Sequence, residues 1–222
     1  MTRYAVIGAS SGTGRQIVRY LADKHVQVRA ISRRPLAAQE GVEPYAADVT
    51  DPASIAKALE GDFDAVFYTV DIHGLRNSRE TVRSVMYDGC INTIHAAAAA
   101  GAKRFVLLSV IGPDRPSWVW WILNAIKPGM QRNVLDRERA LIHSGLSYVI
   151  CRAPRLNDSP GGVIPIAATA SEHRLDMGMG IARADLARAM ARAAAAAPER
   201  TIWDIYADSG GPIPAWLRTD KR

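Results

Sequence analysis

The chain of 222 residues has few cysteines and lacks a metal-binding pattern. Its two cysteines, Cys90 and Cys151, fall in a helical pattern and a strand pattern, and its five histidines do not cluster. This spacing does not suit a metal site, so we expect no metal. Buried, reduced thiols are typical of a cytoplasmic protein, and that is the location we predict.

We expect neither a leader nor a membrane-spanning segment. The N-terminus runs directly into a strand pattern and does not resemble a signal peptide. The densest apolar stretch, Trp118 to Ile126, is too short to cross a bilayer. We therefore expect no membrane partner.

The sequence is basic but contains no recognisable nucleic-acid-binding motif. The net charge is +6, but there is no helix-turn-helix signal, no aromatic RNA-binding motif and no basic tail beyond Lys221-Arg222. We expect attraction for anionic ligands and no nucleic acid. Eight arginines have spacings that predict exposed helix faces: Arg79, Arg83, Arg132, Arg137, Arg139, Arg183, Arg188 and Arg192.

A glycine-rich turn follows the first apolar run. Residues 4–7 predict a strand, Gly8-Ala9-Ser10-Ser11-Gly12-Thr13-Gly14 follows at once, and a helical pattern opens at Arg15. Strand, turn and helix in this order predict a dinucleotide phosphate site. Glycines let the backbone approach the pyrophosphate, and the helix N-terminus offers free N–H groups. A plain tight turn is the alternative.

The second strand pattern indicates which dinucleotide binds. It ends in Ser32-Arg33-Arg34, and no acidic residue lies between Asp23 and Glu40. A site for NAD usually has an acidic residue there for the ribose 2′-hydroxyl. Guanidinium groups suit a phosphate better, so we predict that Arg33, with Ser32 and Arg34, binds the 2′-phosphate of NADP(H). A solvated basic turn is the alternative.

Strand and helix patterns alternate along the chain. Strands are expected at 2–8, 26–32, 44–47, 64–69, 104–109, 147–152 and 201–206, and helices at 13–24, 52–60, 78–100, 130–144 and 183–197. This order predicts an α/β fold, a Rossmann-like doubly wound parallel sheet with helices on both faces. Ligands of such sheets bind at the carboxyl ends of the strands.

We expect a single NAD(P)-binding domain over residues 1–222, because no linker divides the chain. Residues 157–182 carry several prolines and glycines, and we predict an irregular substrate lobe near 153–182. The apolar tail 212–217 would cover a neighbour in a homodimer.

Together these segments resemble the atypical short-chain dehydrogenase/reductases, which include NmrA-like regulators and biliverdin-IXβ/flavin reductases. Matching segments besides the glycine turn are 47–51, 103–109, 144–150, 154–158 and 183–187. The resemblance implies that Asp48 and Val49 meet the adenine and that Thr69 and Val70 line the nicotinamide side. A turn acid and a strand end are the alternatives at these two places.

The proton-transfer pair of most short-chain dehydrogenases is absent. Those proteins carry a tyrosine and, four residues later, a lysine that lowers the tyrosine's pKa. The corresponding positions here are Met130 and Val134, and Tyr148 lies in a strand pattern with no lysine near it. The biliverdin-IXβ/flavin reductase branch also lacks the pair, and hydride transfer there depends on holding cofactor and flat substrate together.

Further candidates for the substrate site surround this region. The active-site serine of that branch falls on Val110, beside Ser109, and its pocket histidine falls on Arg155. Ser109 would bond the nicotinamide amide or a substrate oxygen, and Arg155 a carboxylate or a phosphate, with a surface ion pair as its alternative. Asp71 and His73 are acid–base candidates, or parts of a polar loop. Three tryptophans predict an apolar wall for an aromatic substrate, unless they form a buried helix or a dimer contact: Trp118, Trp120 and Trp121.

Three functions fit these residues. The first is an NADPH-dependent oxidoreductase that reduces a planar, conjugated or aromatic small molecule, such as a flavin, quinone, tetrapyrrole or polyketide. The second is a non-redox cyclase, dehydratase or isomerase on the same scaffold, with Asp71, His73 and Arg155 as its tools. The third is an NmrA-like NADP-binding sensor with a protein partner.

Overall fold

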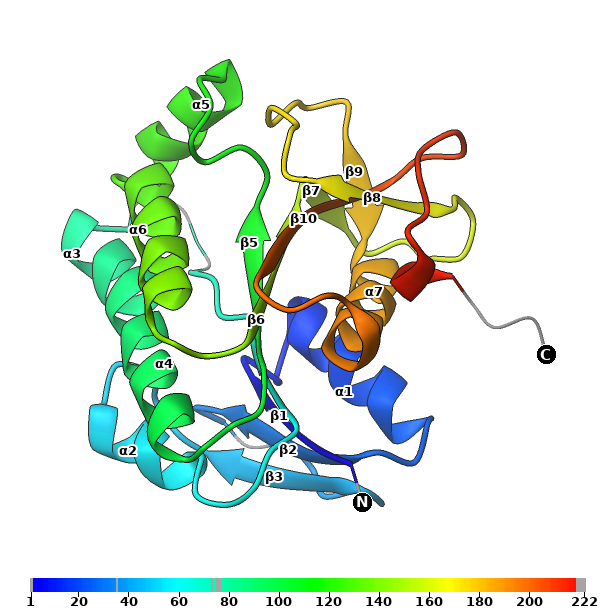
Figure 1. The fold of residues 1–222 in the computed structure, drawn as a ribbon. Coiled ribbons are helices and arrows are strands. Elements are labelled where there is room, and N and C mark those ends of the chain that lie inside the picture. The colour runs from blue at the N-terminus through cyan, green and yellow to red at the C-terminus, as the bar shows by residue number, and fades with distance from the viewer. Residues whose placement is uncertain (1, 35, 73, 75–76, 219–222) are drawn as a thin grey trace.

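The computed structural model describes residues 2–34, 36–72, 74 and 77–218, and it has the predicted Rossmann-like fold (Figure 1). Within these residues, one eight-stranded sheet has the order β3-β2-β1-β4-β5-β6-β10-β8. Its strands are β1 (Arg3–Ile7), β2 (Gln27–Ser32), β3 (Val42–Ala46), β4 (Ala65–Tyr68), β5 (Phe105–Val110), β6 (Tyr148–Ala153), β8 (Ile166–Ala170) and β10 (Thr201–Ala207). All neighbours pair in parallel except β8, which is antiparallel to β10.

Helices cover both faces of the sheet. Figure 1 shows α1 (Gly12–Ala22) and α7 (Arg183–Ala196) on one side, and α2 (Pro52–Ala58), α4 (Gly89–Ala99) and α6 (Met130–His143) on the other. Alternate strand residues enter opposite cores: Val6 of β1 packs toward α1 and α7, whereas Ile7 packs on the other face. This two-sided burial is the reason that the central strands β4 and β5 are apolar at nearly every position.

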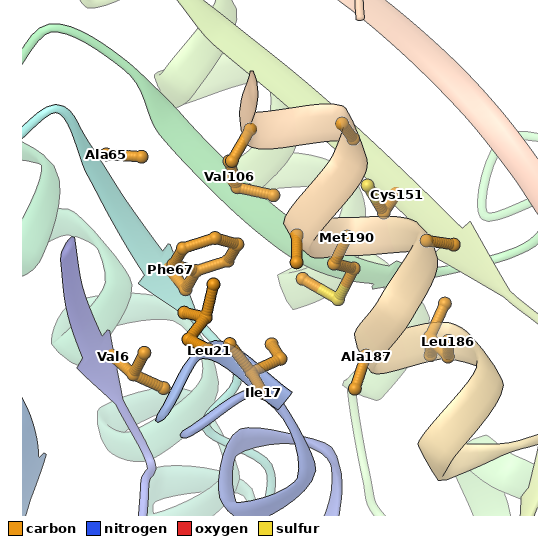
Figure 2. Close-up of a cluster of buried hydrophobic side chains, with 14 of the residues drawn as sticks. Val6, Ile17, Leu21, Ala65, Phe67, Val106, Cys151, Leu186, Ala187 and Met190 are labelled. Atoms are coloured by element: carbon orange, nitrogen blue, oxygen red, sulfur yellow. The ribbon is translucent and has the colours of Figure 1, made fainter. Parts of the chain in front are cut away.

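Close packing of α1 and α7 fixes the glycine turn against the sheet. Figure 2 shows Ile17 and Leu21 of α1 and Met190 of α7 in one cluster with Phe67 of β4 and Val106 of β5. All of these side chains are buried. The start of α1 is therefore held rigidly at the carboxyl end of β1.

The helix expected over 78–100 contains a change of helical type. It consists of α3 (Arg79–Arg83), the π-helical segment η1 (Ser84–Asp88) and α4. A π turn leaves carbonyl groups outside the usual α-helical pattern, and such turns often occur at functional sites. Here the Val85 carbonyl accepts a hydrogen bond from the Tyr68 hydroxyl at 3.2 Å.

The segment 157–182 is more regular than the sequence predicts. It contains β8, which joins the main sheet, and β9 (Gly180–Ala182), which pairs with β7 (Arg155–Asn157) in a small parallel ladder. The expectation of an irregular lobe was wrong for these strands. The sequence of β8, Ile-Ala-Ala-Thr-Ala, has no strong strand pattern, and its partner β10 begins only at Thr201.

A short apolar helix, α5 (Trp118–Ile126), extends beyond the carboxyl end of β5 (Figure 1). The Ser117 side chain caps it by accepting a hydrogen bond from the Val119 N–H at 3.2 Å. Among the described residues, no helix is both long and apolar enough to span a bilayer. A 3₁₀ turn, η2 (Ala215–Leu217), lies near the C-terminus.

The strand β3 forms one edge of the sheet. Glu43 accepts two hydrogen bonds from Arg29 of β2, at 3.0 and 2.9 Å, and one from Arg3 at 2.9 Å. The hydrogen bond from Arg29 lowers the pKa of Glu43. The next residue is Pro44, which has no N–H group to donate.

Candidate functional site

A cleft of about 900 Å³ runs along the carboxyl ends of the parallel strands. It begins at the glycine turn after β1, crosses the ends of β4, β5 and β6, and reaches α5. The crossovers reverse direction between β1 and β4, because α1 and α4 cover opposite faces of the sheet. Open α/β sheets bind their ligands at this switch point.

The glycine turn presents groups suited to a pyrophosphate. The residues Gly8, Ser10, Ser11, Gly12 and Thr13 line the cleft. Ser11 begins α1 without a capping hydrogen bond from its side chain, and the buried Thr13 hydroxyl has no partner among the described residues. The first helical N–H groups also lack partners within a helix. Free donors around an open backbone cradle therefore fit a dinucleotide.

Gly14 has a different role from the rest of the turn. It is not among the described residues that line the cleft. A Cβ atom at Gly14 would lie 2.3 Å from the Gly8 carbonyl oxygen and 2.5 Å from Thr69 Oγ1. Gly14 therefore allows α1 to pack closely against the ends of β1 and β4.

Among the described residues, the end of β2 places one arginine in the lining of the cleft. Arg33 lines the cleft, is exposed, and makes no hydrogen bond or ion pair with the part of the chain that the structure describes. Arg34 is exposed and lies outside the described lining, and the Ser32 hydroxyl donates to the Arg34 carbonyl at 2.6 Å. Of the three predicted phosphate ligands, Ser32 and Arg33 line the cleft and Arg34 does not.

The adenine and nicotinamide candidates follow the ends of β3 and β4, which β2 and β1 separate in the sheet. Asp48 and Val49 line the cleft after β3, and Thr69 and Val70 line it after β4. Oδ1 of Asp48 accepts hydrogen bonds from the N–H and hydroxyl of Thr50 at 2.9 and 2.8 Å. Asp48 is thus a turn acid that keeps Oδ2 for a ligand. The Thr69 hydroxyl donates to the Ile7 carbonyl at 2.8 Å, which ties β4 to β1.

Ser109 belongs to a buried charged network that sequence reasoning missed. Its hydroxyl donates to Glu138 of α6, which is 1% exposed and also binds Arg152 of β6, 4% exposed. Arg152 Nη2 lies 2.6 Å from Oε2 of Glu138, and Nε lies 3.1 Å from Oε1. Burial lowers the pKa of Arg152, but the bond and charge of Glu138 more than offset this, so the net shift is upward. Ser109 lines the cleft, and its engaged hydrogen leaves its lone pairs for a donor there.

The apolar wall comes from one face of α5. Its lining residues are Trp118, Val119, Ile122, Leu123 and Ile126. They repeat at the spacing of one helix face.

The expected wall of three tryptophans was wrong at two positions. Trp120 is 1% exposed, and its indole N–H donates to the Gly112 carbonyl at 2.8 Å. Trp121 is 76% exposed and lies outside the described lining. The lining face of α5 follows positions 118, 122 and 126 and positions 119 and 123, and Trp120 and Trp121 fall outside both rows.

Charged candidates line the substrate end. Asp71 forms an ion pair with Lys127 at 3.1 Å, and both residues line the cleft. Arg155 lines it too, beside Val110, and has no ion pair within the described chain. His73 lies outside the described residues. The Asp71 carboxylate is therefore engaged with Lys127 and is not a free base.

Two arginines in the lining were missed as site residues. Arg183 binds Asp158 at 2.8 Å, and its Nε would lie 3.7 Å from a Cβ atom at Gly12, next to the phosphate turn. Arg137 is 3% exposed, which overturns its expected place on an exposed helix face. The sequence carries no signal for either role, because both residues fit an ordinary charged helix surface.

Proton transfer by a tyrosine has no candidate at this site. No tyrosine of the described residues lines the cleft. Burial raises the pKa of Tyr68 well above its usual value. Tyr148 is the first residue of β6 and therefore lies at the amino ends of the parallel strands, whereas the cleft lies at their carboxyl ends. Met130 lines the cleft and Val134 is fully buried, at the positions where other short-chain dehydrogenases carry tyrosine and lysine.

The fold and this cleft define a dinucleotide-binding protein of the Rossmann class. Residues 8–197 match the model of the NAD(P)H-binding family, and the chain belongs to that family. This confirms the resemblance to the atypical short-chain dehydrogenase/reductases.

Relatives of the chain have diverse descriptions. It is 30% identical over 164 residues to an uncharacterized sugar epimerase, YhfK, of Bacillus subtilis, covering 70% of this chain and 73% of that protein. It is 32% identical to the photosystem II assembly factor Ycf39 of Synechocystis, over 49% of this chain and 34% of that relative's length. The solved structure of ChuY, an anaerobilin reductase of Escherichia coli, superposes with a TM-score of 0.71 at 20% identity, covering 96% and 100% of the two chains.

Proposed function

We propose that the protein is an NADPH-dependent reductase of a planar, conjugated or aromatic small molecule. One observation carries this proposal: a single cleft joins the glycine turn and the free Arg33 to the apolar face of α5. Sites for small ligands combine apolar walls with a few placed polar groups. The description of ChuY as an anaerobilin reductase supports the proposal by analogy of fold.

In this proposal, different residues of the cleft bind the cofactor and the substrate. The first turn of α1 binds the pyrophosphate, Arg33 binds the 2′-phosphate, and Oδ2 of Asp48 accepts from the adenine amine. The Ser109 oxygen, fixed as an acceptor by Glu138, accepts from the carboxamide N–H₂ of the nicotinamide. When bound, NADPH supplies a hydride. Trp118 and Ile122 hold the flat substrate, and the final proton comes from water.

Arg33→Ala should weaken NADPH binding by tenfold or more and leave NADH binding within about twofold. The charge-assisted contact that is lost contributes ~1.5–3 kcal/mol. Calorimetric titration with both cofactors measures the change. Arg34→Ala is the matched control, because this neighbouring arginine lies outside the described lining of the cleft. Equal losses in the two variants, or equal wild-type affinities for NADPH and NADH, would contradict the assignment.

Trp118→Ala should raise KM for an aromatic substrate by about tenfold, because the variant loses an apolar contact of roughly 1.5 kcal/mol. Trp121→Ala should leave KM unchanged, because that side chain points away from the cleft.

Tyr148→Phe should keep the rate within a few-fold, whereas loss of a general acid typically costs ~100-fold or more. Steady-state kinetics on the three variants checks this. A collapse of activity in Tyr148→Phe would return the protein to tyrosine chemistry.

A second candidate is an epimerase or isomerase, because the relative YhfK is described as a sugar epimerase. The apolar face of α5 opposes this, since a sugar needs many polar partners. The deciding experiment incubates the protein and NADPH with 1,4-naphthoquinone, FMN or biliverdin, and in parallel with nucleotide sugars. Consumption of NADPH with a conjugated acceptor supports the reductase. Sugar isomerisation without net NADPH consumption supports the alternative, and binding without turnover supports an NmrA-like sensor.

A further inference from the structure

Arg137 is a buried cation without an acidic partner. It is 3% exposed on α6 and also lines the cleft. Its Nη2 donates to the Leu108 carbonyl at 3.0 Å and its Nη1 to the Met86 carbonyl at 3.4 Å. Its Nε has no partner among the described residues, and none of their carboxylates forms a salt bridge with it.

Arg152 is a buried arginine whose charge is neutralised by an acidic side chain. Arg152 is similarly buried, but Glu138 binds it through two oxygen atoms. Two neutral carbonyl oxygens hold Arg137 in place without neutralising its charge. A guanidinium has five N–H donors, so further donors of Arg137 remain for a ligand. Because buried charges are normally paired, the missing counter-ion of Arg137 is expected to come from the ligand.

The position of Arg137 on α6 directs it toward the same cleft as Met130. These residues are seven positions apart, so they lie on one helix face, with Val134 between them. The π-helical segment η1 supplies the Met86 carbonyl from the opposite side. Carbonyl groups of η1 and β5 thus both contact the guanidinium of Arg137. This guanidinium belongs to α6, the helix that carries Met130 and Val134 at the tyrosine and lysine positions.

With the cofactor bound as proposed above, it would not supply the negative charge at this place. Its phosphates are assigned to the glycine turn and Arg33, the ribose beside the nicotinamide is neutral, and the oxidised nicotinamide ring is positive. Only the substrate remains as a source of an anionic group.

We propose that Arg137 stabilises the oxyanion that forms on a conjugated carbonyl substrate when it accepts hydride. This rests on the proposed reductase function. In the step, the C–H electron pair of NADPH forms a new bond to carbon of the acceptor. The π electrons move to its carbonyl oxygen, NADP⁺ is left, and water later protonates the oxyanion. A fixed cation in a cleft lowers the barrier by meeting charge where it develops.

A bound phenol tests this without turnover. We would titrate 2-naphthol from its neutral to its anionic form by absorbance, free and bound to the full chain with NADP⁺. The pKa of bound 2-naphthol should be lowered by about 1–2 units, because an opposite charge favours the ionised form. An unchanged or raised pKa in the wild-type protein, or no binding, overturns the inference. Lowered pKa with no NADPH consumption on quinones would instead contradict the proposed reductase function alone.

Variants separate charge from packing. Arg137→Met should abolish the naphthol shift and slow single-turnover hydride transfer to 1,4-naphthoquinone by about 100-fold. Arg137→Lys keeps the charge and should retain most of the shift. Arg139→Met is the control, because Arg139 is exposed on the same helix. Equal behaviour of the Lys and Met variants overturns the inference, and the wild-type titration decides it should Arg137→Met fail to fold.

Discussion

Replacement of Glu138 by glutamine is expected to lower the free energy of unfolding by about 3–5 kcal/mol, because Arg152 would remain buried without its anion. Glu138 and Arg152 are 1% and 4% exposed, so water cannot replace the lost partner. Asp114 lies 3.4 Å from Arg152 and is half exposed, whereas the buried Asp204, its register partner on β10, accepts hydrogen bonds from the N–H groups of Glu172 and His173. Urea unfolding followed by circular dichroism gives the change directly.

Asp136→Asn is the matched control on the same helix. Asp136 pairs with Arg132 at 3.0 Å, but the Arg132 side chain is 80% exposed, and such pairs contribute about 0–1 kcal/mol. The double variant Glu138→Leu with Arg152→Met should be more stable than Glu138→Gln, because it removes both members of the buried ion pair. Similar midpoints for Glu138→Gln and Asp136→Asn would show that the buried pair does not stabilise the fold.

Gly14→Ala should destabilise the protein by about 3 kcal/mol, at the upper end of what an added methyl group costs in a packed interior. Its Cβ atom would lie 2.3 Å from a backbone oxygen, that of Gly8, and backbone cannot move aside as a long side chain can. Either α1 or the turn must shift. Thermal unfolding would show the loss, and calorimetry with NADPH would show weaker binding as the turn is displaced.

Gly12→Ala separates packing from backbone strain at the same turn. Gly12 has φ +54°, so alanine is strained there by roughly 1–2 kcal/mol, but the nearest atom to its Cβ is 3.7 Å away. Both Gly12→Ala and Gly12→Val should fold. Gly12→Val should in addition lose dinucleotide binding, because the branched valine side chain would occupy the cleft. A Gly14→Ala protein as stable as Gly12→Ala would contradict the close approach of α1 to β1.

Local sequence patterns predicted the elements that position the site. Strands with apolar residues on both faces are typical of a buried parallel sheet. A glycine-rich turn after the first such strand predicts a helix whose N-terminus faces the dinucleotide phosphates. β8 could not be predicted this way, because its pairing depends on β10, which follows much later in the chain. The orientation of α5 was also missed. Three tryptophans close together suggested one wall, but the helical turn sends Trp120 into the core and Trp121 outward.

Charged residues gave the least reliable prediction. Arg137 and Arg139 look alike in the sequence, yet Arg137 is buried and Arg139 exposed. The difference arises from what covers α6: η1 and the end of β5 lie over one face and solvent over the other. The Ser109–Glu138–Arg152 network joins β5, α6 and β6, and no spacing in one segment reveals it.

The edge strand β3 has a consequence for self-association. An open sheet edge offers unpaired backbone groups that can recruit a strand from another molecule. Pro44 removes a donor from this edge, and Glu43, held by Arg29 and Arg3, places a fixed ionic cluster beside it. The two features together act against intermolecular strand addition, so this margin of the molecule is protected from amyloid-like stacking at high protein concentration.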